Sequence, residues 1–405
     1  MITTISPYSD PRNRALAGSG FDGVVRITTG GSYGTGTLLY DGRTIITAAH
    51  LLSNGMTNVS VVFETLTGTN TWSTGGTVIH PEYDPSNSNN DLALIRLTST
   101  APTTAERYEI YRSSDELGKI MTMVGYGTPG TGSSGTLSGY AGSALRLKAD
   151  NHVDTTAEQL KTSLGNGIAW TPLAKSQLLA DFDDGTVSHD ALGELIGVSG
   201  LGVGDKEGLI SRGDSGGPAF LNNQIAGIAS YAASLSKTGA SPDIDQQSNS
   251  SIGEIAAWQR VSHYQQWIDQ NIRQNFSTPP SRPEEVQRSI IEGNSSTRYA
   301  YFLLQFNGAR SDPQQTLSVE YRTVDGTAQA GSDYISSRGT LKLYPNETQT
   351  VIPIEILGDN VPEPDETFFL EVTNPVGGSF GSGQIKLIAM RTIVDDDGWL
   401  GVAGS

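Results

Sequence analysis

The apolar residues of this chain occur mostly in short runs, separated by turn-forming Gly, Ser, Thr and Asn residues. Five such runs lie near its beginning, at residues 24–27, 36–40, 44–48, 59–63 and 78–79. Short apolar runs bounded by turn residues predict β-strands. Because no helical pattern separates these runs, they favour a β-barrel over a parallel sheet.

Two further strands and two helices are predicted downstream. Residues 120–126 and 225–231 are apolar runs of strand length, and residues 157–164 predict a short helix. Residues 258–272 predict a second helix, because apolar residues recur there at helical spacing. These residues are Val261, Tyr264, Trp267, Ile268 and Ile272. Residues 128–209 include a Gly/Ser/Thr-rich run, where no strand register is predicted.

A polar stretch with three prolines, residues 276–285, marks a change of pattern. Prolines of this density end a helix and favour an extended linker. Beyond it, residues 318–324 alternate as a strand should. A chain of 405 residues is also longer than one ordinary core. We therefore expect one domain at residues 15–275, the linker, and a second domain at residues 286–398.

Composition narrows the classes of partner and the cellular location. The formal net charge of −17 argues against nucleic-acid and anionic-membrane partners, which need clustered basic residues. No apolar stretch reaches the about 18 residues of a membrane span. The chain has no cysteine, and its first residues lack the basic and apolar regions of a signal peptide. We expect a secreted or cell-surface protein of bacterial type, either with its signal peptide removed or exported without one.

The sequence around Ser215, Gly213-Asp214-Ser215-Gly216-Gly217-Pro218, indicates a nucleophile. A serine hydroxyl needs a base to take its proton and donors to stabilise the oxyanion that it forms. The glycines permit a tight turn in which the N–H groups of Gly213 and Ser215 point at one spot. A base is available in Thr47-Ala48-Ala49-His50, and an acid in Asp91-Leu92-Ala93-Leu94-Ile95.

These three segments, in the order His, Asp, Ser, resemble the chymotrypsin/trypsin family of serine peptidases. A chance coincidence of three motifs in this order is disfavoured. Residues 120–127, which include Val124-Gly125-Tyr126-Gly127, resemble a strand of the family's second barrel. The resemblance implies an all-β fold of two six-stranded β-barrels with a C-terminal helix. It also implies a catalytic triad of His50, Asp91 and Ser215, and protein or peptide substrates.

The resemblance extends to specificity and activation. It places Leu209 at the base of the S1 pocket and Ser230 and Ala232 on its walls. An apolar floor cannot compensate a buried cation, which predicts apolar or small P1 residues, unless Asp243 reaches the pocket from the loop at residues 238–245.

In the family a newly freed N-terminus pairs with the acid before the nucleophile, here Asp214. Cleavage after Arg14 would make residues 1–14 a pro-segment, although the usual Ile-Val-Gly-Gly is absent.

The second domain resembles Calx-beta domains, which implies a β-sandwich with Greek-key order. The resemblance rests on residues 325–334, 339–341, 345–348, 363–368 and 393–397. It implies structural Ca²⁺ ligands at one end of the sandwich, namely Glu292, Asp333, Asp359, Glu363, Glu366, Asp395, Asp396 and Asp397. Gly358 lies where some Calx-beta domains that bind calcium strongly carry another acidic residue, just before Asp359. The alternative is an acidic spacer that binds no metal tightly.

Asp181-Phe182-Asp183-Asp184-Gly185 is either a small calcium loop or, more simply, a solvated acidic turn. His80 is expected to be structural, and His152 and His189 match no motif.

The expected function is a serine endopeptidase. The competing class is a secreted calcium-dependent adhesion or matrix protein that uses the peptidase fold as a scaffold. An HtrA-like quality-control protease would need a peptide-binding module where the Calx-beta module lies.

Overall fold

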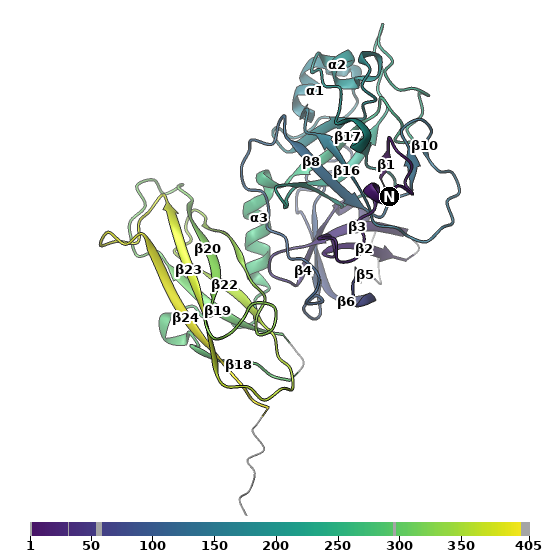
Figure 1. The fold of residues 1–405 in the computed structure, drawn as a ribbon. Helices are drawn as coiled ribbons and strands as arrows, with labels where there is room; N and C mark the ends of the chain where they lie inside the picture. Colours follow the sequence, from purple (N-terminus) through teal and green to yellow (C-terminus); the bar gives the residue numbers. More distant parts are fainter. Residues whose placement is uncertain (1, 31, 54–58, 295–296, 398–405) are drawn as a thin grey trace, which may run out of the picture. The chain divides into compact units, whose positions relative to one another are not determined.

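The computed structural model describes residues 2–30, 32–53, 59–294 and 297–397. The chain divides into two compact units, Met1–Trp267 and Ile268–Ser405, which are described separately below (Figure 1). The helix α3 (Val261–Gln274) begins in the first unit and ends in the second.

The first unit begins with the closed six-stranded barrel that the apolar runs predicted. Its hydrogen-bonded order is β2-β3-β4-β7-β6-β5. The strands are β2 (Val24–Thr29), β3 (Ser32–Leu38), β4 (Thr44–Thr47), β5 (Val59–Thr65), β6 (Gly68–Ile79) and β7 (Ala93–Leu97). Alternate residues point inward and form a buried cluster that includes Ile27, Ile45, Phe63 and Ile95.

The rest of the first unit is built on a curled sheet of seven strands, in the order β11-β8-β15-β16-β17-β13-β12. The strands are β8 (Ile120–Gly125), β11 (Leu147–His152), β12 (Thr155–Thr156), β13 (Gln177–Asp181), β15 (Pro218–Leu221), β16 (Gln224–Ala233) and β17 (Ile255–Arg260). Its two edges, β11 and β12, are consecutive parts of one chain segment, so the sheet curls back on itself. The predicted pair of β-barrels is confirmed in this form.

A small sheet adds the N-terminal residues to this second barrel. Its order is β10-β9-β1-β14, with β1 (Thr3–Thr4), β9 (Gly130–Thr131), β10 (Gly135–Thr136) and β14 (Gly208–Leu209). Thr3 pairs with Leu209, and the side chain of Ile2 is fully buried in the second-barrel core.

The helices agree with the predictions except at one boundary and one element. The helix α1 (Ala157–Leu164) has the predicted bounds, because the Thr156 side chain caps its start and Gly165 ends it at positive φ. Trp258 was predicted to begin the C-terminal helix, but it lies in β17, paired with Leu178 and Ala229. A further helix, α2 (Ala191–Ile196), was not predicted.

Six short 3₁₀ turns also occur among the described residues. They are η1 (Pro11–Asn13), η2 (Ala49–Leu51), η3 (Gly165–Gly167), η4 (Val187–His189), η5 (Gly204–Lys206) and η6 (Pro283–Glu285).

The second unit is the predicted β-sandwich. One sheet has the order β18-β24-β23-β20-β21, and the other pairs β19 with β22. The strands are β18 (Ser289–Ile291), β19 (Arg298–Gln305), β20 (Leu317–Asp325), β21 (Arg338–Leu343), β22 (Gln349–Ile356), β23 (Glu366–Val376) and β24 (Lys386–Val394). Phe302 from the small sheet and Phe368 from the large one share a buried cluster, in which Phe368 stacks on Tyr334 at 4.6 Å.

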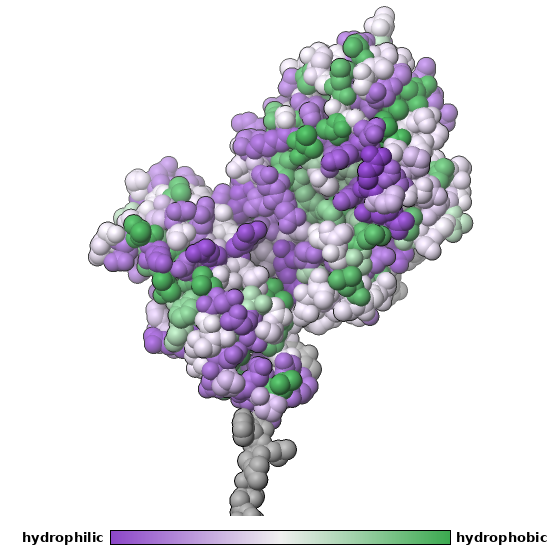
Figure 2. Space-filling view, viewed as in Figure 1, coloured by the Kyte–Doolittle hydropathy of each residue, from purple (hydrophilic) through white to green (hydrophobic). Residues whose placement is uncertain are grey.

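The surface is mixed in character. On the face drawn in Figure 2, hydrophilic residues surround smaller hydrophobic patches on both units. Among the described residues, no helix is both long and apolar enough to cross a membrane.

Candidate active site

His50 lies just after the end of β4 and contacts Asp91. The chain leaves β4 at Thr47 and enters η2, which contains His50. The Asp91 carboxylate accepts two hydrogen bonds from this residue, one from the backbone N–H (2.8 Å) and one at Nδ1 of the ring (2.8 Å). Asp91 is 2% exposed and His50 is 34% exposed. With Nδ1 facing the buried carboxylate, Nε2 is the ring nitrogen left to act as a proton acceptor.

A third donor on Asp91 comes from Ser230. Its hydroxyl donates to the same oxygen that faces the His50 ring, at 2.5 Å. Ser230 lies at a β-bulge between Ala229 and Tyr231, which re-aims its side chain. The sequence indicated Ser230 only as a pocket wall. Its contact with Asp91 was missed because no local motif marks it.

The Ser215 turn lies against the segment that leads to His50. The carbonyl of Ser215 accepts a hydrogen bond from Thr35 N–H at 2.9 Å. Gly216 has φ +80°, and a Cβ there would lie 2.1 Å from Thr47 Oγ1 and 2.8 Å from Ala48 N. Only glycine permits this approach, so the packing requires the glycine that the motif supplies.

Two backbone donors of this turn are available to a ligand. The Gly213 carbonyl accepts a hydrogen bond from Thr35 Oγ1 at 2.9 Å, and Gly213 has φ +98°. Among the described residues, neither Gly213 N–H nor Ser215 N–H donates to another protein group. Two neighbouring N–H groups without a protein partner are what an oxyanion hole requires.

Asp214 points away from this surface into the protein. It is 1% exposed and accepts hydrogen bonds from Gly127 N–H and Ser211 N–H, each at 2.8 Å. Burial raises the pKa of its carboxyl. A Cβ on Gly125 would lie 2.2 Å from its Oδ1, so the glycines of residues 120–127 make room for this carboxylate.

The predicted S1 residues are spread along the second barrel. Leu209 is fully buried in its hydrophobic core, and Ala232 on β16 packs against the same cluster. Asp243 is engaged in its own loop, where it accepts hydrogen bonds from Ser234, Ser251 (3.2 Å) and the N–H of Asp245 (3.1 Å).

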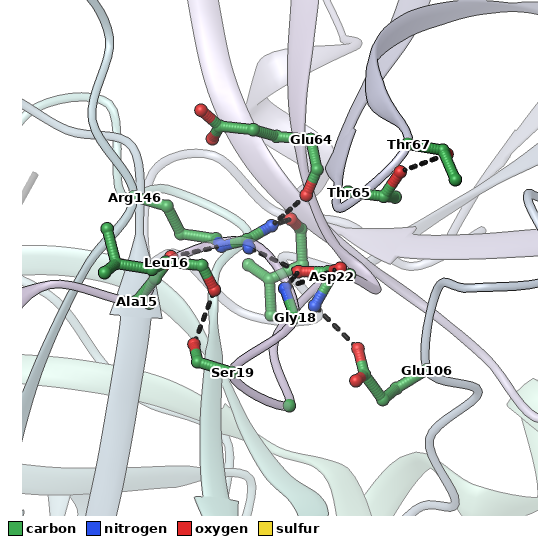
Figure 3. A network of polar contacts seen from close by, with 12 residues as sticks. Ala15, Leu16, Gly18, Ser19, Asp22, Glu64, Thr65, Thr67, Glu106 and Arg146 are labelled. Carbon is green, nitrogen blue, oxygen red and sulfur yellow. Dashed lines mark hydrogen bonds and ion pairs between the residues drawn. The ribbon is translucent and has the colours of Figure 1, made fainter.

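The segment around Arg14 is held by a buried ion pair (Figure 3). Arg146 pairs with Asp22 at 2.7 Å, and each side chain is 1% exposed. The same guanidinium donates to the carbonyls of Ala15, Val24 and Glu64. Ala15 N–H donates in turn to the carbonyl of Arg146 at 3.0 Å. This network joins the residues after Arg14 to strands of both barrels.

His80 and Asp184 take no part in this site. The ring of His80 packs on those of Tyr264 and Trp267, at 5.5 and 5.0 Å between centroids, and burial lowers its pKa. Asp184 pairs with His189 at 2.6 Å in a partly exposed turn.

In the second unit the predicted acidic residues gather in two groups. Glu292, Asp359 and Asp397 form one, and Asp333, Glu363 and Glu366 form the other. Within each group the nearest carboxylate oxygens all lie within 4.8 Å of one another. Asp395 and Asp396 lie beside the first group, where Asp396 accepts a hydrogen bond from Gly293 N–H at 2.9 Å.

The electrostatics of these groups suit a hard cation. Burial and then the charge of Asp359 raise the pKa of Glu292 to about 7. Burial and then a hydrogen bond with Asp333 raise the pKa of Glu366 to about 7. One oxygen each of Glu292 and Asp397 is buried without a hydrogen-bond partner. Oxygen-only donor sets with unpaired carboxylate atoms fit Ca²⁺.

Two family models match this chain. The Trypsin model matches residues 13–162, a range that includes His50 and Asp91 and ends before Ser215. The Calx-beta domain model matches residues 305–397. The chain therefore carries a trypsin-like domain followed by a Calx-beta domain, as its motifs predicted. The first of these supports a serine protease, and the second belongs to a domain type associated with calcium.

Individual relatives match only parts of the chain. Human sodium/calcium exchanger 2 is 40% identical over 108 residues, which cover 24% of this chain and 12% of the exchanger. The sodium/calcium exchanger Calx of Drosophila melanogaster is 39% identical over 88 residues, which cover 22% of this chain and 9% of that exchanger. The chain thus spans a small part of these exchangers. A solved structure of neuropsin, a serine protease of mouse brain, covers 64% of this chain and 98% of its own, with 16% identity and a TM-score of 0.45.

Proposed function

We propose that this protein is a serine endopeptidase that cleaves protein substrates through an acyl-enzyme on Ser215. In this mechanism His50 takes the proton of the Ser215 hydroxyl as it attacks the scissile carbonyl, and later gives it to the leaving amine. Asp91 holds the imidazole in one tautomer and stabilises the imidazolium. The observation that carries the proposal is the set of three hydrogen bonds on Asp91, from His50 N–H, His50 Nδ1 and Ser230 Oγ.

The unpaired N–H groups of Gly213 and Ser215 support the same chemistry. In the tetrahedral intermediate they would donate to the oxyanion, and each such donor contributes about 3–4 kcal/mol to transition-state stability. Their positions are fixed by the positive φ of Gly213 and by the contact of its carbonyl with Thr35.

We also propose that the S1 pocket prefers apolar or small side chains. Leu209 provides no charge, and the carboxylate of Asp243 is occupied by the hydroxyls of Ser234 and Ser251. A substrate Arg or Lys would therefore be desolvated without a partner. A cleavage profile on a peptide library tests this, and a profile dominated by basic P1 residues would overturn it.

The test of the peptidase proposal is covalent labelling by a fluorophosphonate probe. The wild type should be labelled, and Ser215→Ala should not be, with its thermal unfolding unchanged. Ser188→Ala, on the exposed turn η4, is the matched control and should be labelled fully. Labelling of Ser215→Ala equal to the wild type would refute the assignment.

We propose that the Calx-beta domain binds Ca²⁺ structurally through its two acidic groups. The cation would offset the repulsion among these carboxylates and stabilise the folded domain by mass action. Removal of calcium with EDTA should lower the melting temperature of this domain, with little effect on turnover of a small ester substrate. Asp395→Ala with Asp396→Ala, which changes residues beside the first group, should reduce the shift. A melting temperature that does not depend on calcium would support the alternative of an acidic spacer without metal.

The competing function is a secreted calcium-dependent adhesion or matrix protein in which the peptidase fold is a scaffold. The hydrogen bonds on Asp91 favour the enzyme, because a scaffold has no need of them. Casein hydrolysis with and without a serine-directed inhibitor separates the two. In either case we propose a secreted or cell-surface location.

A further inference from the structure

A third acidic group lies in the trypsin-like domain. Asp181 ends β13, Asp183 follows two residues later, and Asp190 precedes α2. One oxygen from each lies within 4.8 Å of the other two. All three residues are buried, with exposed fractions of 1%, 3% and 2%. The solvated acidic turn that the sequence allowed is therefore wrong for Asp181 and Asp183.

A fourth carboxylate reaches this group from a separate segment. Glu207, just before β14, is fully buried, and its Oε1 has no hydrogen-bond partner. Gly202, with φ +73°, passes between it and Asp183, because a Cβ on Gly202 would lie 2.8 Å from both Asp183 Cβ and Glu207 Oε2. Oδ1 of Asp183 is likewise buried without a partner. Asp183 and Glu207 thus each present one buried oxygen without a hydrogen-bond partner.

Backbone donors satisfy only part of this cluster. Asp181 accepts from Leu192 N–H at 2.6 Å, Asp190 from Gly193 N–H at 2.7 Å, and Glu207 from Val203 N–H at 2.5 Å. Among the described residues, no Lys, Arg or His forms an ion pair with any of these carboxylates.

Concentrated negative charge in a buried site is costly. Asp183 and Glu207 are 3% and 0% exposed, and Asp154 adds a partly buried carboxyl whose Oδ2 has no hydrogen-bond partner. Side chains that serve only packing do not gather carboxylates in this way, because neutral residues of the same size avoid the penalty.

We propose that Asp181, Asp183, Asp190 and Glu207 form a calcium site in the trypsin-like domain, independent of the Calx-beta groups. The donors are all oxygens, as a hard cation requires. The nearest oxygens of Asp181, Asp183 and Asp190 lie within 4.8 Å of one another, so one cation can contact all three. Ca²⁺ accepts irregular coordination, whereas Mg²⁺ demands near-ideal octahedral geometry.

The site would connect segments distant in the sequence. Its ligands come from the end of β13, from the start of α2 and from the residue before β14, which carries Leu209. The α2 helix lies close to α1 beside the second barrel in Figure 1. A bound cation would therefore order residues 181–207, which are part of the segment 128–209 where the sequence predicted no strand register.

Hydrogen exchange followed by mass spectrometry tests the site in the full chain, with Ser215→Ala to prevent self-cleavage. At a calcium concentration about 100 times the dissociation constant, amides in residues 181–207 that exchange by local opening should exchange roughly 100-fold more slowly than in EDTA. Peptides from the Calx-beta loops report separately on calcium binding there. Magnesium at the same concentration should give less protection.

Three variants assign the effect. Asp183→Asn with Glu207→Gln should remove the calcium-dependent protection of residues 181–207 and leave that of the Calx-beta domain intact. Asp183→Asn alone provides a milder test with the same expected direction. Asp184→Asn, the adjacent control outside the cluster, should keep the response. Calcium-independent exchange in the unaltered site, or a response that survives Asp183→Asn with Glu207→Gln, would overturn the proposal.

Discussion

Asp91 accepts three hydrogen bonds, and those from His50 and from Ser230 would act differently in the proposed catalysis. The two from His50 fix the position and tautomer of the ring, and the one from Ser230 holds the carboxylate itself. The sequence predicted that His50 and Asp91 act together, because both lie in local motifs. It could not identify Ser230 as their partner, because that contact depends on a β-bulge in a strand far along the chain.

Asp91→Asn tests the role of the acid in orienting His50. An amide that donates to Nδ1 selects the wrong tautomer, which lowers kcat by about 10⁴-fold. Steady-state kinetics on a peptide substrate should show this loss in kcat with little change in KM. Asp84→Asn, in the same loop but bonded to Ser86 and Asn87, should retain wild-type kcat. Equal losses in both variants would indicate damage to the loop instead.

Gly216→Ala tests the close approach of the Ser215 turn to β4. The added methyl would meet Thr47 Oγ1 at 2.1 Å, and overpacking of this kind costs about 1–3 kcal/mol of stability. Activity should fall together with stability in urea unfolding. Gly118→Ala is the matched control, because Gly118 has a similar φ of +76° but nothing within 4 Å of its Cβ position. Similar effects in both variants would assign the cost to φ alone.

At the scale of elements, the sequence predicts the ends of a helix correctly where its capping residues lie directly beside it. Thr156 and Gly165 delimit α1, and both can be recognised in the sequence. The short helix α2 was missed, because a single turn and a half capped by Asp190 has no apolar period long enough to detect. Trp258 was assigned to the wrong element because its apolar neighbours suit a buried strand and a helix equally.

The acidic end of the sandwich predicts an unusual pH dependence. The folded-state pKa of Glu292 is about 7, above its ordinary value of 4.5, because of burial and neighbouring carboxylates. A raised pKa means that protonation favours the folded domain, and this stabilisation is lost as pH rises from about 4.5 through 7. In EDTA the melting temperature of the Calx-beta domain should therefore fall between pH 5 and pH 8.

Glu292→Gln provides the check on this assignment. The variant should flatten the fall in melting temperature measured by calorimetry in EDTA, because the amide does not titrate. Saturating calcium should reverse the slope in the wild type, since the cation needs ionised carboxylates. A wild-type melting temperature that rises with pH in EDTA would contradict the pKa argument.

At the scale of the whole trypsin-like domain, the buried guanidinium of Arg146 connects the two barrels through its ion pair and hydrogen bonds. Arg146→Ala would leave Asp22 buried and unpaired, and such a loss destabilises by about 3–5 kcal/mol. Urea unfolding followed by tryptophan fluorescence, to which the buried Trp258 contributes, measures this effect. Arg12→Ala, which removes an exposed pair with Asp10, should leave the midpoint unchanged.

The position of the N-terminal segment bears on activation. Processing after Arg14, with Ala15 as the new terminus, stays a prediction, and N-terminal sequencing of active protein tests it directly. Residues 2–4 lie within the second barrel, and Ala15 is held by Arg146. Active protein that begins before Ala15 would show that cleavage is unnecessary.

Gly358 limits how the calcium affinity of the sandwich can be tuned in the laboratory. Comparison with strong binders would suggest Gly358→Asp as a gain of one ligand. However, a Cβ at this position would lie 1.7 Å from the carbonyl oxygen of Gly293, the neighbour of Glu292. The new side chain would have to push that backbone away and would separate Glu292 from Asp359. An engineer who wants tighter binding should therefore alter residues on other loops, because the apparent improvement at residue 358 would dismantle the first acidic group.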